Sequence, residues 1–289
     1  KTGEDYNTIT LWEDAVDGDL VTAMSQPTAH VYDDDGTLSD PFDVDGSTTN
    51  ATYFIKITSP AGERHNGTNA SGSLILVNNQ VNINDAYTLL DYLRVSGEGS
   101  YIDVFDGDNS TSTMQNCIIT SGHYKTLKGK FNVYNTIILS SNTDSAVGLG
   151  GYRKFINNTI IKTDSKGGKC ITGWDNDFVL ANTICQNFST TYEGYGVGGG
   201  RTFATNLSDD TQFPGTSVDN TTLSFVGSGD YHLASDDEAI NAGTDYSGTF
   251  TTDIDGQTRS GTWDIGADEY VATYYPFKKF NHGINVGVF

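Results

Sequence analysis

Basic and acidic residues occur together at one place in the chain where they could act on an acidic polysaccharide. Arg153 and Lys154 are adjacent, and Asp175 and Asp177 follow in the next part of the sequence. A lyase neutralises a uronate carboxylate with a cation or an arginine and removes the α-proton with an arginine or lysine base. The basic pair is therefore the candidate for such chemistry. Solvated turns explain the same residues, and we favour that interpretation.

Three aspartates in one short stretch are weak candidates for metal ligands. Ca²⁺ is held by several oxygen ligands, which closely spaced carboxylates supply. Aspartate is also common in turns for a different reason, because its side chain accepts hydrogen bonds from nearby backbone amides. Calcium is the one cofactor that the sequence suggests, with Asp103, Asp106 and Asp108 as its candidate ligands.

Other catalytic patterns are incomplete. Asn142-Thr143-Asp144 resembles the first motif of galacturonan hydrolases, but the paired aspartates, the Gly-His-Gly and the Arg-Ile-Lys that should follow are missing. No Ser-His-Asp pattern is recognisable, and the glycine-rich stretch 194–200 lacks the Lys-Ser/Thr of a phosphate-binding loop. We therefore predict no catalytic residue and favour a non-enzymatic role.

A short sequence motif that begins with asparagine recurs through the middle of the chain. The asparagines are separated by steps of 19, 23, 24 and 24 residues, and each is followed by β-branched residues that favour a strand. A fixed period in this range predicts a solenoid. Stacked asparagines would form a ladder, which Asp91 would extend by one coil. The ladder residues are Asn116, Asn135, Asn158, Asn182 and Asn206.

These elements predict an all-β protein with one domain, a right-handed parallel β-helix over residues 1–270. A β-sandwich with accidental internal similarity is the alternative. Leu11, Trp12, Ala15 and Val16 have helical spacing, so a short helix within residues 1–25 is expected to cap the first coil. Further strands are expected at 53–58, 74–77 and 88–95. Residues 271–289 form a C-terminal extension.

The beginning, one loop and the end of the domain resemble secreted β-helix proteins of the pectin-lyase-like architecture. The matching segments are Tyr6 to Val21, the Gly62–Gly67 loop, the asparagine ladder, and the endings Asp253–Arg259 and Asp264–Tyr270. The resemblance implies the fold over roughly residues 5–270. It implies no single activity, because similar chains include lyases, hydrolases, phage spikes and adhesins.

Charge and composition narrow the range of partners. Sixteen basic and 37 acidic residues give a formal net charge of −21, which opposes binding to nucleic acid or to an anionic membrane. No apolar stretch approaches the roughly 18 residues that cross a bilayer, so no membrane insertion is expected. Residue 1 is lysine, which suggests that a secretory leader was removed. We expect a secreted, extracellular or cell-surface protein.

Two kinds of covalent modification are suggested for such a location. Cys170 and Cys185, 15 residues apart, could form a disulfide, while Cys117 occupies a ladder-like position. Eight Asn-X-Ser/Thr sequons make a glycoprotein plausible, and Asn66 and Asn69 in a polar loop are the first choices. The sequons are at Asn50, Asn66, Asn69, Asn109, Asn157, Asn187, Asn206 and Asn220.

The extension after Tyr270 differs in composition from the rest of the chain. Residues 271–289 contain two lysines and no acidic residue, so they carry +2 against −23 for the remainder. An exposed apolar strand needs a covering partner, either its own last coil or the edge of another subunit. Head-to-tail contacts that do not close on themselves produce a filament. The expected contact residues are Tyr274, Tyr275, Phe277, Lys278, Lys279, Phe280, Ile284, Val286, Val288 and Phe289.

The sequence therefore favours a structural subunit that binds copies of itself and forms an extracellular filament. A carbohydrate-active enzyme such as a polysaccharide lyase is the first alternative. A phage or viral fibre module that binds glycans is the second.

Overall fold

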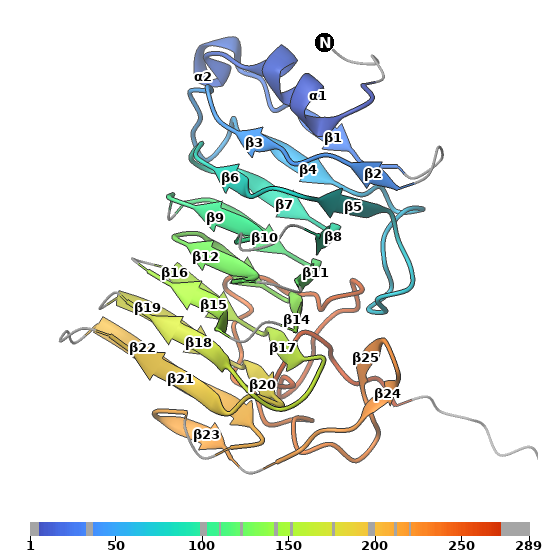
Figure 1. Ribbon diagram of the computed structural model, residues 1–289, viewed down its shortest axis with the longest axis vertical. Helices are drawn as coiled ribbons and strands as arrows, with labels where there is room; N and C mark the ends of the chain where they lie inside the picture. Colours follow the sequence, from blue (N-terminus) through green and yellow to red (C-terminus); the bar gives the residue numbers. More distant parts are fainter. Residues whose placement is uncertain are drawn as a thin grey trace, which may run out of the picture.

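The computed structural model is a parallel β-solenoid with two short helices at its N-terminal end (Figure 1). It describes residues 6–32, 37–98, 103–109, 111–121, 124–141, 144–150, 153–174, 177–195, 200–210, 213–219 and 221–272. In this part of the chain no helix has the length and apolar character needed to span a bilayer. The predicted parallel β-helix is confirmed.

The helices α1 (Ile9–Val16) and α2 (Leu20–Ala23) cover the first coil. Thr8 caps α1 by accepting a hydrogen bond from the backbone N–H of Leu11, and Asp19 caps α2 in the same way through Thr22. The predicted capping helix is confirmed, but its buried side chains are Ile9, Trp12 and Glu13, whereas Leu11 is exposed.

Each coil contributes one strand to each of three faces, and neighbouring strands on a face are parallel. Face 1 consists of β1 (Thr28–His30), β4 (Lys56–Thr58), β7 (Leu89–Asp91), β10 (Thr113–Gln115), β13 (Asn132–Tyr134), β16 (Arg153–Ile156), β19 (Asp177–Ala181) and β22 (Gly200–Ser208). Face 2 consists of β2 (Leu38–Ser39), β5 (Leu74–Val77), β8 (Arg94–Gly97), β11 (Ile118–Ser121), β14 (Ile137–Ser140), β17 (Thr159–Lys162) and β20 (Ile184–Gln186), and it ends on the second half of β22. Face 3 consists of β3 (Asp43–Val44), β6 (Val81–Ile83), β9 (Phe105–Gly107), β12 (Leu127–Gly129), β15 (Ser145–Leu149), β18 (Lys169–Gly173) and β21 (Thr190–Gly194).

The core is a set of columns in which one apolar side chain from each coil lies over the next. On face 1 the strand register aligns six buried residues, and faces 2 and 3 contribute similar columns. Because only the stack excludes water from these side chains, the coils stabilise one another. The face 1 column is Ile57, Leu90, Met114, Val133, Phe155 and Leu180.

After the last coil the chain leaves the solenoid and returns along its side. β23 (Thr216–Val218) pairs with β22, and β24 (Phe225–Gly227) forms an antiparallel hairpin with β25 (Asp230–Leu233). Residues 234–272 contain no named strand, and we call them the return segment. Figure 1 shows this segment passing beside the coils between faces 1 and 2.

The asparagine ladder is real, but two of its predicted members were wrong. The residues at the corner between faces 1 and 2 all have positive φ, and the strand register aligns Asn157 with Asn135 and Asn182. Asn158 and Asn206 each lie one residue later, aligned with Thr136 and Thr183. A positive φ favours asparagine over most residues, so the backbone decides which asparagine of the 157–158 pair occupies the corner. The corner residues are Tyr92, Asn116, Asn135, Asn157, Asn182 and Thr205.

The displaced asparagines form a second, inner set of contacts. Asn158 accepts a hydrogen bond from the backbone N–H of Thr136 (2.9 Å) and donates to Val133 O (3.1 Å). Asn206 bridges the backbones of Thr183 and Leu180 in the same way. Asp91 is not a corner residue either, although its carboxylate accepts a hydrogen bond from Asn116 Nδ2 (3.1 Å). Asp91 therefore extends the ladder through its side chain, although it precedes the corner residue Tyr92 by one position.

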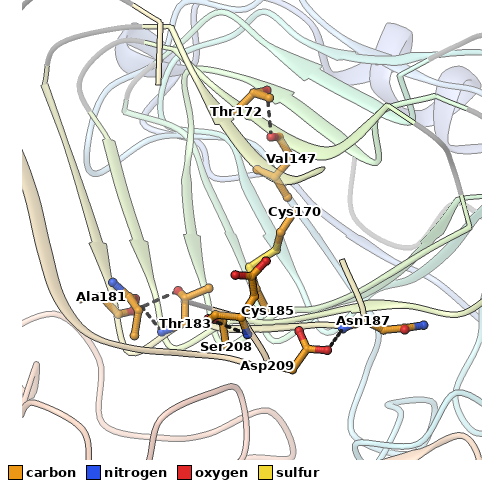
Figure 2. The surroundings of a disulfide bond; sticks show 11 residues. Val147, Cys170, Thr172, Ala181, Thr183, Cys185, Asn187, Ser208 and Asp209 are labelled. Carbon is orange, nitrogen blue, oxygen red and sulfur yellow. Dashed lines mark hydrogen bonds between the residues drawn. A yellow bond between two sulfur atoms is a disulfide. The ribbon is translucent and has the colours of Figure 1, made fainter. Parts of the chain in front are cut away.

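A disulfide joins Cys170 on β18 to Cys185 on β20, with 6.1 Å between the two Cα atoms (Figure 2). Both cysteines are buried inside the solenoid, and they belong to consecutive coils and to different faces. The bond therefore crosses the core and ties face 3 of one coil to face 2 of the next. Cys117 is buried and unbridged.

Candidate functional site

The outer edge of the asparagine ladder is the surface on which the return segment lies. Asn135 Nδ2 donates to Thr252 O (2.6 Å), and Asn157 Nδ2 donates to Asp264 O and Gly266 O (both 3.0 Å). Asn182 exchanges two hydrogen bonds with the backbone of Thr244. The ladder thus supplies backbone-like donors and acceptors to a segment that has no strand of its own.

Arg259 is the central side chain of this contact. Its guanidinium is fully buried, donates to the carbonyl oxygens of Gly266 (3.0 Å) and Ala267 (2.7 Å), and forms an ion pair with Glu269 (3.1 Å). It also donates to Asn135 Oδ1 (3.0 Å), which places a charge-assisted bond directly on the ladder. Burial lowers the pKa of Arg259, and the nearby carboxylates, Glu269 first among them, oppose that effect. The arrangement is a structural pin and leaves no exposed guanidinium for a substrate.

The Gly62–Gly67 loop is also structural. His65 is buried, and its Nε2 lies 2.8 Å from Asn116 O at the corner. Burial lowers the pKa of His65 to about 4, so the ring is neutral at physiological pH. The Arg64 guanidinium lies 3.9 Å from the centre of the Tyr92 ring.

Two groups of side chains in the described part of the chain could hold a metal ion. One consists of Glu13, Asp17 and Asp85 beneath α1. The other consists of His232, Asp255 and Asp268, where the β24–β25 hairpin meets the return segment. Sequence reasoning missed both sites, because their members come from segments outside the repeat.

The predicted calcium ligands are arranged differently. Lys128 Nζ lies 2.6 Å from Asp106 and 3.5 Å from Asp103, so an ammonium group occupies the space between these two carboxylates. Asp108 is exposed. An internal cation therefore already balances this cluster.

The two basic side chains of the lyase hypothesis, Arg153 and Lys154, point to opposite sides of the strand β16. Arg153 is buried and Lys154 is exposed, because successive side chains of β16 point to opposite sides. Asp177 begins β19 on the next coil, and Asp175 lies outside the described residues. Arg153 and Lys154 cannot both face one surface-bound sugar. Of the hydrolase-like motif, Asn142 and Thr143 lie outside the described residues, and Asp144 forms an ion pair with Lys125 (3.0 Å).

The hydrogen bonds of the side-chain amides separate the sequons into two classes. Asn157 and Asn206 are fully buried, and the amide nitrogens of Asn157, Asn187 and Asn206 donate hydrogen bonds to backbone carbonyls. A glycan on any of these three nitrogens would break those bonds. The amides of Asn50, Asn66 and Asn109 accept hydrogen bonds locally and lie at the surface, as does Asn69, while Asn220 lies outside the described residues.

An open groove of about 440 Å³ runs across face 1. The strands β7, β10, β13 and β16 form its floor, and Ala51, Phe54, Gly248 and Thr249 contribute to its sides. Aromatic, hydroxyl and amide groups dominate its lining, and the described lining residues include one cation and no carboxylate. The groups with the clearest potential to bind a ligand are Tyr87, Thr111, Gln115 and Lys154, whereas the Tyr134 ring is buried and packs against Phe250.

The N-terminal end of the solenoid is acidic and is covered by the two helices. Residues 1–50 contain 12 acidic residues and one lysine, and the described parts of this range form the first coil and its helical cap. Tyr270, near the end of the described chain, packs against a hydrophobic cluster that contains Ile184 and Leu207 of the last coils. All of the predicted tail contacts from Tyr274 to Phe289 lie outside the described residues.

Comparison with known proteins finds no match: neither a family profile, nor a curated protein, nor a solved structure corresponds to this chain.

Proposed function

We propose that this chain is a structural subunit of an extracellular or cell-surface filament, assembled head to tail through residues 271–289. The observation that carries the proposal is the charge asymmetry along the solenoid. The first coil and its cap are rich in acidic residues, whereas the cationic, aromatic tail follows Tyr270, which packs against the hydrophobic cluster that contains Ile184 and Leu207. Opposite charges on the two ends favour contact between copies and disfavour contact between like ends.

The acceptor in this proposal is the outer edge of β1, at the start of face 1. In the part of the chain that the structure describes, β1 pairs with β4 on one side and with no strand on the other. The alternation of Ile284, Val286 and Val288 suits a strand that adds to such an edge. A tail that left one end of a subunit and paired at the far end of the next would generate an open polymer.

The buried disulfide supports the proposed location. Disulfides persist in oxidising compartments and are rare in the cytosol. Cys170 and Cys185 are buried and joined across two coils, which fits a protein that folds during secretion. The proposed resemblance to secreted pectin-lyase-like proteins points in the same direction, and the surface sequons make a glycoprotein the natural form of such a subunit.

Negative-stain electron microscopy of the untagged chain tests the proposal. We expect fibres with a regular axial repeat from the full chain and single short rods from a chain that lacks residues 272–289, with unchanged circular dichroism. Lys278→Glu/Lys279→Glu is the matched control that keeps tail length and apolar content, and it should weaken assembly most at low salt. Fibres that survive the deletion would contradict the tail mechanism. Closed dimers would indicate that the tail instead pairs reciprocally at the β21 end.

The groove on face 1 favours glycan binding as a second candidate function. The ring of Tyr87, several hydroxyl groups and one lysine suit an acidic glycan chain. The lack of a carboxylate among the described lining residues argues for binding without cleavage. A Lys154→Ala variant should lose affinity for uronate oligosaccharides in calorimetry, and equal affinity in both proteins would exclude the groove.

A further inference from the structure

The cluster formed by His232, Asp255 and Asp268 joins two segments that lie outside the coils. His232 is on β25, and both aspartates are in the return segment. One potential ligand atom from each residue lies within 4.8 Å of the other two. His232 Nε2 is 3.5 Å from Asp255 Oδ2. Two ligands on tetrahedral bonds of about 2.1 Å would lie about 3.4 Å apart, so this pair already has the spacing of metal ligands.

Two oxygen atoms of the cluster lack hydrogen-bond donors. Asp268 is 3% exposed; its Oδ2 accepts a hydrogen bond from the backbone N–H of Leu233 (2.7 Å), and its Oδ1 is buried without a partner in the described structure. Asp255 Oδ1 is in the same position. Buried carboxylate oxygens are nearly always satisfied by a donor or a cation. These two oxygen atoms are therefore available to a cation bound between the two side chains.

His232 is oriented as a metal-bound histidine usually is. Its Nδ1 lies 2.5 Å from Asp230 Oδ1, which also accepts a hydrogen bond from the His232 backbone N–H (3.2 Å). A carboxylate on Nδ1 fixes the ring and directs Nε2 toward the ligand position. Gly67 leaves the space that the ring needs, because a Cβ on Gly67 would lie 2.5 Å from Nε2.

We propose that His232, Asp255 and Asp268 bind one divalent transition-metal ion, with Zn²⁺ as the preferred ion. Imidazole and carboxylate together suit zinc, whereas Ca²⁺ and Mg²⁺ prefer sites made entirely of oxygen. Three protein ligands leave a fourth position for water. The ion clasps the hairpin to the return segment, and this role does not depend on filament assembly or on glycan binding.

Calorimetry of the chelator-treated protein with Zn²⁺ alone tests the site. We expect one ion per chain, with binding at least 100-fold weaker in His232→Gln and in Asp268→Asn. His30→Gln, on the exposed side of β1, and Asp236→Asn, in an exposed turn, are the matched controls and should bind like the parent chain. Zn²⁺ should also raise the melting temperature of the parent chain and of the controls, but not that of the two site variants.

Three results would contradict the proposed zinc site: the parent chain fails to bind micromolar Zn²⁺, the two site variants bind Zn²⁺ as tightly as the parent chain, or the parent chain binds Ca²⁺ as tightly as Zn²⁺. If a variant does not fold by circular dichroism, the NMR spectrum of the parent chain decides. Zn²⁺ must then shift the imidazole resonances of His232 among the five histidines, and unchanged His232 signals would contradict the assignment.

Discussion

Replacement of Arg259 by methionine should detach the return segment from the ladder. The substitution keeps an unbranched side chain but removes five hydrogen bonds, to Asp268 O, Glu269, Asn135, Gly266 and Ala267. It also leaves the buried Glu269 carboxylate without its cation. Removing one partner of a buried ion pair costs about 3–5 kcal/mol. Glu269 keeps hydrogen bonds from the backbone N–H groups of Ser260 and Asp264, so we expect the lower half of that range.

Chemical denaturation followed by tryptophan fluorescence measures this loss. The Trp263 ring is buried and its centre lies 5.3 Å from the Arg259 guanidinium, so its emission reports the return segment directly. Adding Glu269→Gln to Arg259→Met should recover part of the lost unfolding free energy, because the second change removes the uncompensated charge. Coupling between contacting residues is typically 0.5–3 kcal/mol. A loss below about 1 kcal/mol in Arg259→Met, or strictly additive effects, would refute the argument that Arg259 pins the segment.

Two further predictions concern the core and the N-terminal cap. Cys170→Ala/Cys185→Ala should lower the unfolding free energy by about 3 kcal/mol, the chain-entropy value for a loop of about 15 residues, and reduction of the parent chain should have a similar effect; an unchanged denaturation midpoint would contradict this. Burial raises the pKa of Glu13 to about 8, with Asp17 and Asp85 adding to the effect, so the folded state binds a proton that the unfolded state releases above about pH 4.5. Stability from this group is therefore lost as the pH rises toward 8, and Glu13→Gln should flatten the melting temperature between pH 5 and 8; parallel pH profiles for the two proteins would rule it out.

The regular part of the fold could be predicted from the sequence because successive coils repeat the same pattern, an asparagine followed by β-branched residues. The strand expected at 74–77 is β5, and the period of the asparagines indicated stacked coils. The coil length is not constant, however, and a pattern match cannot distinguish Asn157 from Asn158. The φ of 55° at Asn157 makes that choice, and backbone conformation is not readable from the letters alone.

The candidate sites could not be predicted, because contacts outside the repeat create them. His232 and Asp268 are 36 residues apart and meet only after the hairpin and the return segment have folded against the coils. The partner of Asp106 was equally hidden, since Lys128 reaches it from the next coil. Sequence spacing suggested an acidic cluster there, but the charge that balances it comes from a different strand.

The return segment changes how this solenoid should come apart. In a simple repeat protein each unit touches only its neighbours, so unfolding begins at an end and proceeds like a zipper, coil by coil. Here one stretch of chain is hydrogen-bonded to Asn135, Asn157 and Asn182, which belong to three successive coils. No one of these coils can open without breaking bonds that also hold the other two. The C-terminal half should therefore exchange its amide hydrogens as one cooperative block, and the hydrogen bond from the Asn69 N–H to Gly229 O (2.8 Å) extends this block to the loop that follows β4.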